Sequence, residues 1–219
     1  MKTILLPLLA FIIGFCSVFG YQYVKTNKTE APVIKPQPEA DQPLAGPLKL
    51  VPPSDAVSGI LTITRGKADI FSRGETEFKE ASNGAQILLG ESIATKENSA
   101  ATAGIAGIVS VNLDESSELV FANLYPENMV LQQKNGKILY KISKQLSVRA
   151  LHTLITMEPG EASINIIDTD LSITVKTGSV KFALVDMDDN THVWDLKADQ
   201  RANIDDSARM VEIASLRSQ

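Results

Sequence analysis

The chain has 219 residues, a formal net charge of −5 and 44% hydrophobic residues, which is typical of a folded protein and excludes a largely disordered one. The acidic balance and the lack of a Lys and Arg cluster argue against nucleic acid as a partner, because phosphate binding depends on such clusters. The one cysteine, Cys16, lies near the N-terminus, so the rest of the chain can form neither a disulfide framework nor a thiolate metal site.

The N-terminal segment predicts a membrane-spanning helix. Residues 4–24 carry no charge, and a helix of roughly twenty residues is long enough to cross a hydrocarbon core of about 30 Å. Two interpretations stay open: a signal anchor that is retained, which the length favours, or a secretory signal peptide that is cleaved after Gly20. We assign residues 1–25 to this anchor or signal peptide.

The charges around this segment indicate its orientation. Only Met1, Lys2 and Thr3 precede it, whereas Lys25 and Lys28 follow it. If positive charge stays on the cytoplasmic side, the folded part lies across the membrane. We therefore expect a single-pass membrane protein with an extracytoplasmic domain, which would be secreted if the leader is cleaved.

Residues 26–56 are rich in proline. Proline fixes φ near −65° and removes a backbone donor, so we expect an extended, polyproline-like linker that carries the following domain away from the bilayer. A docking peptide for SH3-like grooves is the alternative, and the expected compartment disfavours it. Seven of the ten prolines in the chain fall here: Pro32, Pro36, Pro38, Pro43, Pro47, Pro52 and Pro53.

Residues 57–207 consist of short runs in which apolar and polar residues alternate, separated by glycine or polar clusters. Period-two alternation places one face of a strand against a core, so the region predicts an all-β domain: a sandwich, a barrel or a solenoid. Helical spacing is found only from Ala208 to Leu216, and we set residues 208–219 apart as a C-terminal tail. The clearest alternating runs are Val109–Leu113, Leu146–Ala150, Ile164–Ile166, Leu171–Val175, Val180–Leu184 and His192–Leu196.

Three glycines interrupt these runs in the same way. Gly66, Gly136 and Gly178 each follow a basic residue by one or two positions and precede an alternating run. Glycine adopts φ > 0 without a Cβ clash, so each predicts a tight hairpin or a strand corner. Gly136 and Gly178 are about forty residues apart, which hints at a loose internal repeat of several strands.

The order of these motifs resembles the FecR domain family. That family typically shows an L-x-x-G-[DE]-x-I-x-T step, a serine, an alternating strand that ends in an acidic turn, and then G-x-[VI], V-x-V-x-x-G-x-V and L-x-x-G-Q steps. The corresponding residues are Gly59–Ile63, Leu88–Thr95, Ser99, Leu113–Asp114, Gly136–Ile138, Ile173–Val180 and Leu196–Gln200, with Asp199 where glycine is usual. The resemblance covers most of the chain after Val57 and implies a bacterial source and a FecR-like twisted β-solenoid or sandwich.

Two departures limit what the resemblance implies. The family's Gly-Thr-x-Phe step is missing, because Pro159-Gly160-Glu161-Ala162 stands in its place. Family members that regulate a sigma factor also carry a long cytoplasmic region before the membrane span, whereas three residues precede it here. The resemblance therefore implies a β-rich domain in the bacterial periplasm but not the iron-signalling role.

No residue pattern predicts catalysis, a cofactor or a metal. His152 and His192 lie in β-type stretches without a recognisable nucleophile, so we interpret both as structural or surface residues. The acidic run Asp186–Asn190 fails as an EF-hand, because Thr191 stands where that loop needs glycine and Lys197 where it needs glutamate. We interpret this run as a polar turn.

The sequence thus favours a non-enzymatic, membrane-anchored protein that acts through contact with another cell-envelope protein, in signalling or regulation. The alternative is a module that binds wall polysaccharide or peptidoglycan through exposed aromatic residues, for which Tyr125, Tyr140 and Trp194 are the candidates. A hydrolase is a third hypothesis, and it needs a pair of Asp or His side chains in one cleft.

Overall fold

The computed structural model describes residues 55–73, 75 and 77–216, which contain strands β1 to β17 and no helix. This confirms the all-β class. The predicted membrane segment at 1–25 and all but the last two residues of the linker at 26–56 lie outside the described residues. Within the described part, no helix is long and apolar enough to span a membrane.

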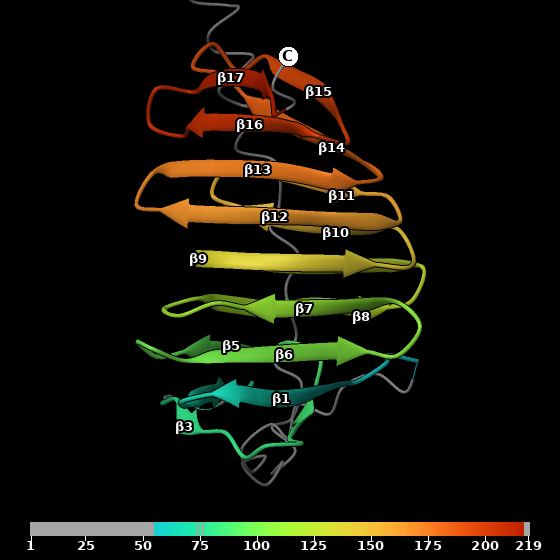
Figure 1. Cartoon of the computed structure of the whole chain (residues 1–219), viewed down its shortest axis with the longest axis vertical. Helices are drawn as coiled ribbons and strands as arrows, with labels where there is room; N and C mark the ends of the chain where they lie inside the picture. Colours follow the sequence, from blue (N-terminus) through green and yellow to red (C-terminus); the bar gives the residue numbers. More distant parts are fainter. Residues whose placement is uncertain (1–54, 74, 76, 217–219) are drawn as a thin grey trace, which may run out of the picture. The chain divides into compact units, whose positions relative to one another are not determined.

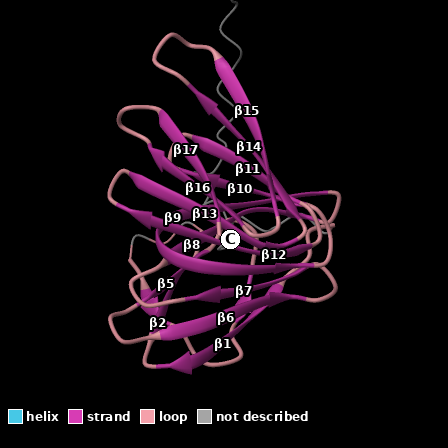
Figure 2. Cartoon of the chain, turned by 45° about the horizontal axis from the view of Figure 1, so that its top comes forward, coloured by secondary structure: helices cyan, strands magenta, loops and turns pink. Residues whose placement is uncertain are grey.

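The strands form two layers that face each other across one core (Figures 1 and 2). In order, sheet A contains β4 (Gln86–Ile87), β1 (Gly59–Arg65), β6 (Ala100–Ile105), β7 (Val109–Leu113), the second half of β9 (Asn128–Ile142), β12 (Gly160–Ile167), β13 (Asp170–Thr177), β16 (Gln200–Asp205) and β17 (Met210–Ser215). Sheet B contains β3 (Lys79–Glu80), β2 (Ala68–Phe71), β5 (Ser92–Thr95), β8 (Glu118–Tyr125), the first half of β9, β10 (Leu146–Ala150), β11 (Thr153–Met157), β14 (Ser179–Val185) and β15 (Thr191–Lys197).

The path of the chain combines features of a sandwich and a solenoid. After β9 the chain adds one hairpin to each layer in turn: β10–β11 to sheet B, β12–β13 to sheet A, β14–β15 to sheet B and β16–β17 to sheet A. Pairing between neighbours is antiparallel except between β9 and β10. The repeat suggested by Gly136 and Gly178 therefore consists of hairpins that alternate between the layers.

The two layers are held together by apolar side chains that are buried at every second position of their strands. In β7, for example, Val109, Val111 and Leu113 are buried while Ser110 and Asn112 are half-buried on the outer face. The inward residues of both sheets belong to a single apolar cluster whose largest fully buried side chains include Tyr140, Phe121 and Phe182. Apolar burial of this kind is the main favourable contribution to folding, at about 25 cal/mol per Å².

The three predicted glycine turns are strand corners. Gly66 and Gly178 lie where the chain passes between the sheets, and Gly136 lies inside β9, whose two halves belong to different sheets. The hairpin interpretation is therefore wrong at these positions. Both Gly136 (φ 79°) and Gly178 (φ 82°) have left-handed backbones that glycine adopts without strain. A Cβ at Gly136 would lie only 2.5 Å from the Ser117 Cα, so the neighbouring strand also excludes a side chain.

A polar network is buried beside the Gly136 corner. The Tyr140 hydroxyl donates to Gln133 Oε1 at 2.9 Å, and the Gln133 amide donates to the Gly136 and Ile164 carbonyls at 2.7 and 3.2 Å. Burial raises the pKa of Tyr140 well above 10, because the phenolate would lose its hydration. The network therefore gives the buried Gln133 amide and Tyr140 hydroxyl hydrogen-bond partners and ties the Gly136 corner of β9 to Ile164 of β12.

Asp206 links three hairpin turns. Its buried carboxylate accepts hydrogen bonds from the His152 backbone N–H at 3.1 Å and lies 2.7 Å from the His152 ring, and Arg209 Nη1 is 3.7 Å away. Its own N–H donates to the Thr169 carbonyl at 2.9 Å. These contacts tie the β16–β17 turn to the β10–β11 and β12–β13 turns, so Asp206 joins the two layers.

The C-terminal segment differs from its predicted spacing. Residues 210–215, within the range set apart as a tail, form β17 and pair with β16 from Met210 opposite Asp205 to Ser215 opposite Gln200. The expectation of helical spacing was wrong because a short apolar run fits either period. Pairing with β16 decides between them, since it places Val211 against the core.

We expect Gly136→Ala to destabilise the protein by at least about 2 kcal/mol more than Gly84→Ala. Both glycines have positive φ, but a Cβ at Gly84 meets nothing within 4 Å, so only Gly136→Ala adds overlap with Ser117. Urea unfolding, followed by the fluorescence of Trp194, measures the difference. Equal losses in the two variants would show that the close contact at Gly136 carries no energy.

We expect Tyr140→Phe to lower the free energy of unfolding by about 1–3 kcal/mol, because Gln133 Oε1 would stay buried without its donor. Tyr125→Phe is the control, since Tyr125 is only half-buried. Chemical denaturation of both variants gives the comparison. An unchanged free energy of unfolding in Tyr140→Phe would mean that water or a rearranged Gln133 amide replaces the hydroxyl as hydrogen-bond partner.

Candidate functional site

The N-terminal end of both layers is closed. Its outermost strands, β3 and β4, have two residues each. The loop that precedes β4 extends the pairing along β1. Gly84 N–H donates to the Leu61 carbonyl at 2.8 Å, and Leu61 N–H donates to the Ala85 carbonyl at 2.9 Å. Short strands and covering loops are the usual protection of a sheet edge, because they leave few free N–H and C=O groups.

Charges reinforce this protection. Lys67 lies 2.9 Å from Glu80 on β3, and Lys79 lies 2.5 Å from Glu75. A strand approaching this edge would have to displace or desolvate these ion pairs, which disfavours pairing with another chain.

The C-terminal end is open. Its outermost strands are β15 with seven residues and β17 with six (Figure 2). Within the part of the chain that the structure describes, β15 pairs only with β14 and β17 only with β16. β15 carries Asp195 and Lys197, whereas β17 has the sequence MVEIAS with Glu212 as its one charge. β17 is therefore the less protected edge.

Hydrogen bonding identifies the free backbone groups of β17. Leu216 N–H donates to the Asp199 carbonyl at 2.7 Å, one step beyond the Gln200 and Ser215 pair. In an antiparallel pair the bonded residues alternate, so the N–H and C=O groups of Glu212 point toward β16. Those of Val211, Ile213 and Ser215 point to the open edge.

The inner faces of the two edge strands leave apolar side chains partly uncovered. Ile213 is 41% exposed although it lies opposite the buried Ala202, and Val211 is half-buried. On β15, the Trp194 indole stacks on Phe182 with ring centroids 5.0 Å apart and remains half-buried. The apolar interior of the sandwich thus reaches solvent at this end.

The β14–β15 turn carries an ordered carboxylate. Asp186 Oδ1 accepts the Asp188 and Asn190 N–H groups, both at 2.9 Å, and Oδ2 lies 2.7 Å from His192 Nε2. The hydrogen bond with His192 and those with the Asn190 and Asp188 backbone lower the pKa of Asp186 to about 2. This confirms the predicted polar turn. The His192 and Trp194 ring centroids are also 5.7 Å apart, so the turn lies beside the half-buried aromatic side chain of β15.

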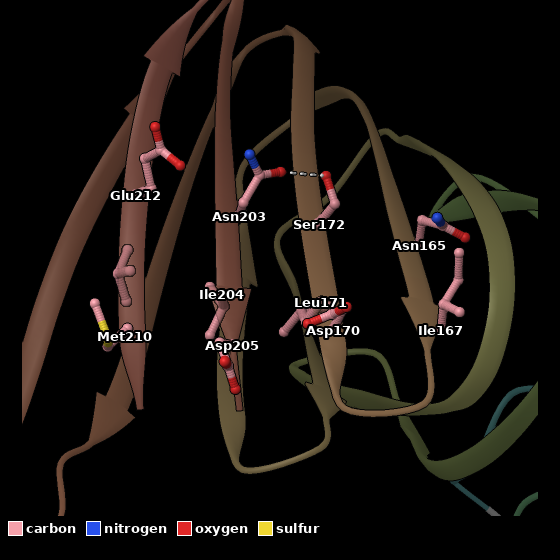
Figure 3. Close-up of a pocket in the computed structure, with 11 residues that line it drawn as sticks. Asn165, Ile167, Asp170, Leu171, Ser172, Asn203, Ile204, Asp205, Met210 and Glu212 are labelled. Carbon is pink, nitrogen blue, oxygen red and sulfur yellow. Dashed lines mark hydrogen bonds between the residues drawn. The ribbon is translucent and has the colours of Figure 1, made fainter. Parts of the chain in front are cut away.

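A shallow groove of about 530 Å³ crosses the outer face of sheet A beside β17 (Figure 3). One row of paired residues across β12, β13, β16 and β17 presents polar side chains: Asn165, Ser172, Asn203 and Glu212. Ser172 Oγ donates to Asn203 Oδ1 at 3.2 Å. The sequence alone does not single out this row, because outward polar residues at every second position are ordinary on a strand.

The structure separates the predicted aromatic candidates. Tyr140 is fully buried, Trp194 packs on Phe182, and Tyr125 lies half-buried at the end of β8. They do not form one exposed platform for sugar rings.

The two histidines each pair with one aspartate, His152 with Asp206 and His192 with Asp186. The hydrogen bonds found among the described residues connect neither histidine to a serine, threonine or cysteine side chain. No group of three or more His, Cys, Asp or Glu side chains in the described ranges is placed to hold a metal ion. What the geometry does offer is backbone donors and acceptors with apolar neighbours, which suit binding to another chain.

No protein-family model matches the chain, and no curated protein matches it. Two crystal structures of a "putative anti-sigma factor" from Parabacteroides distasonis are similar, each with a TM-score of 0.49 and 11% sequence identity. Each match covers 57% of this chain and 59% of the neighbour's chain, so it spans less than two thirds of those proteins. Family membership does not follow from this likeness, and the FecR resemblance stays a prediction from motifs.

Proposed function

We propose that this protein is a non-catalytic docking module that binds another protein chain at its C-terminal edge strands. The observation that carries the proposal is the contrast between the two ends: the N-terminal edge is short, charged and covered, whereas β17 presents three residues whose backbone groups point away from β16 and pair with no other described strand. An exposed edge strand with few charges is a template for strand addition, and proteins normally protect such an edge unless a partner pairs with it.

The uncovered apolar side chains at the same end support the proposal. A strand that pairs with β17 gains backbone hydrogen bonds, and it also covers Ile213 and Val211, which contributes roughly 25 cal/mol per Å² of buried apolar surface. Backbone pairing and apolar contact then act at one place, as they do in known strand-addition complexes.

The polysaccharide alternative has weaker support. Binding of sugar rings usually relies on exposed aromatic faces, and the candidate aromatics are buried, packed or isolated. The polar row beside β17 offers hydrogen bonds to sugar hydroxyl groups, but its amide, hydroxyl and carboxylate groups lie on an open, shallow surface.

We further propose, from the sequence, that residues 1–25 anchor the chain in the bacterial cell membrane and that the β domain lies on the periplasmic side at the end of its proline-rich linker. A role in envelope signalling or regulation rests on the motifs shared with the FecR domain family. Anchoring would confine the domain to a thin shell near the membrane and raise its effective concentration for other anchored chains.

Fractionation tests the anchor. We expect the full chain to stay with the membrane after alkaline extraction and to be digested by protease in spheroplasts that remain intact. A variant with Leu8→Lys and Ile12→Lys should lose the membrane association, since each charge in a membrane core is costly by about 2.5–3.5 kcal/mol. Recovery of the unaltered full-length chain in the cytosol would contradict the proposal.

Photocrosslinking in intact cells tests the docking surface. A photoreactive amino acid at Ile213 or Val193 should give a protein adduct, because both positions lie on the open edge strands. Ile60 is the matched control, since it is 58% exposed against 56% for Val193 but lies at the closed end. Adducts that form equally at Ile60, or at none of the three positions, would refute docking at the C-terminal edges.

A further inference from the structure

We infer that the chain bound at β17 is a second copy of this protein, paired with β17 in antiparallel orientation about a two-fold axis at Ile213. The inference rests on the proposed docking function and names the partner of that same edge. It follows from which backbone groups are free, which residues would face each other and what surrounds the strand.

The free backbone groups select the register. In a two-fold pair, only residues whose groups point to the open edge can exchange hydrogen bonds, and these are Val211, Ile213 and Ser215. With the axis at Ile213, each Ile213 faces its copy and Val211 faces Ser215 of the other chain. All three pairs are then hydrogen-bonded pairs, with two bonds each.

Side chains agree with this register. The inward pairs bring Ile213 against Ile213 and Val211 against Ser215, and the outward pairs bring Glu212 against Ala214. With the axis at Glu212 instead, the two Glu212 carboxylates would face each other, and like charges in directly opposite positions are destabilising. That register would also leave Ser215 without a partner in the strand. The Ile213 register is therefore favoured by both criteria.

The two-fold operation also covers the open core. A rotation about an axis perpendicular to sheet A keeps sheet A beside sheet A and sheet B beside sheet B. The exposed inner faces of β17 and β15, including Ile213 and Trp194, would then meet their own copies. Two stacks of strands become one continuous stack whose outer ends are the closed N-terminal ends.

The chain's own linker is a poorer occupant of this edge. Every stretch of six residues between Pro32 and Pro53 contains a proline, which cannot donate to a strand ladder. Residues 26–31, TNKTEA, lack the apolar alternation that would cover Val211 and Ile213.

Single-cysteine crosslinking of the full chain in its membrane tests the inference. In a Cys16→Ser background, Ile213→Cys should form a disulfide-linked dimer under mild oxidation. In the proposed register the two Ile213 Cα atoms are about 5.5 Å apart, within the range of a disulfide. Glu212→Cys is the matched control, because its Cα atoms would be about 7–8 Å apart on the diagonal, which is too far. We expect at least a tenfold higher yield at Ile213.

Three results would overturn the inference: a higher disulfide yield for Glu212→Cys, no dimer for either variant, or a photocrosslink from a photoreactive amino acid at Ile213 to residues 26–54 of the same chain. A second variant checks the backbone requirement. Ile213→Pro removes a donor that points away from β16, so the domain should keep its strand spectrum by circular dichroism while the dimer in detergent becomes a monomer. A dimer that persists would also count against strand pairing.

These outcomes separate the inference from the proposed function. Photocrosslinks from Ile213 to a different protein, with no disulfide dimer, would remove the second copy and keep the docking function. The absence of any photocrosslink at the C-terminal edges would remove the docking function itself.

Discussion

Backbone hydrogen bonding between successive strands is the constraint on which this structure depends. The inner strands bury one row of apolar side chains and must pair on both sides, because an unpaired backbone polar group in a dry environment is costly. Among the described strands, all but the outermost ones satisfy this requirement: β3 and β15 in sheet B, and β4 and β17 in sheet A, pair on one side only. At the ends of the stack, the free backbone groups of the edge strands must therefore be either shielded or paired with another chain.

The two ends meet this requirement differently. At the N-terminal end, two-residue strands, a covering loop and ion pairs such as Lys67–Glu80 use up or shield the free groups. At the C-terminal end, β17 keeps its alternation of Val211 and Ile213 up to an edge that no other described strand covers. The same repeat that builds the core thus creates a surface shaped to receive one more strand.

The corners make the repeat possible. A strand can pass from one layer to the other only where the backbone bends sharply, and the bend brings it close to the neighbouring strand. Gly136 satisfies both conditions, and the buried Gln133 amide, held by the Tyr140 hydroxyl, donates to the Gly136 carbonyl at the bend. Asp206 ties the turns on the hairpin ends in a similar way, with its carboxylate bonded across both layers.

The sequence by itself determined the strand content and the positions of the corners, because period-two alternation and a glycine with positive φ are local properties. Val109–Leu113 and Gly178 could be assigned without any partner. It did not determine that β17 is a strand, since the spacing of Met210–Ser215 fits two periods and only pairing with β16 decides between them. The edge, the Asp206 contacts and the polar row beside β17 were beyond reach of the sequence for the same reason: each depends on which strands lie side by side, and residues such as His152 and Asp206, far apart in the chain, meet only after folding.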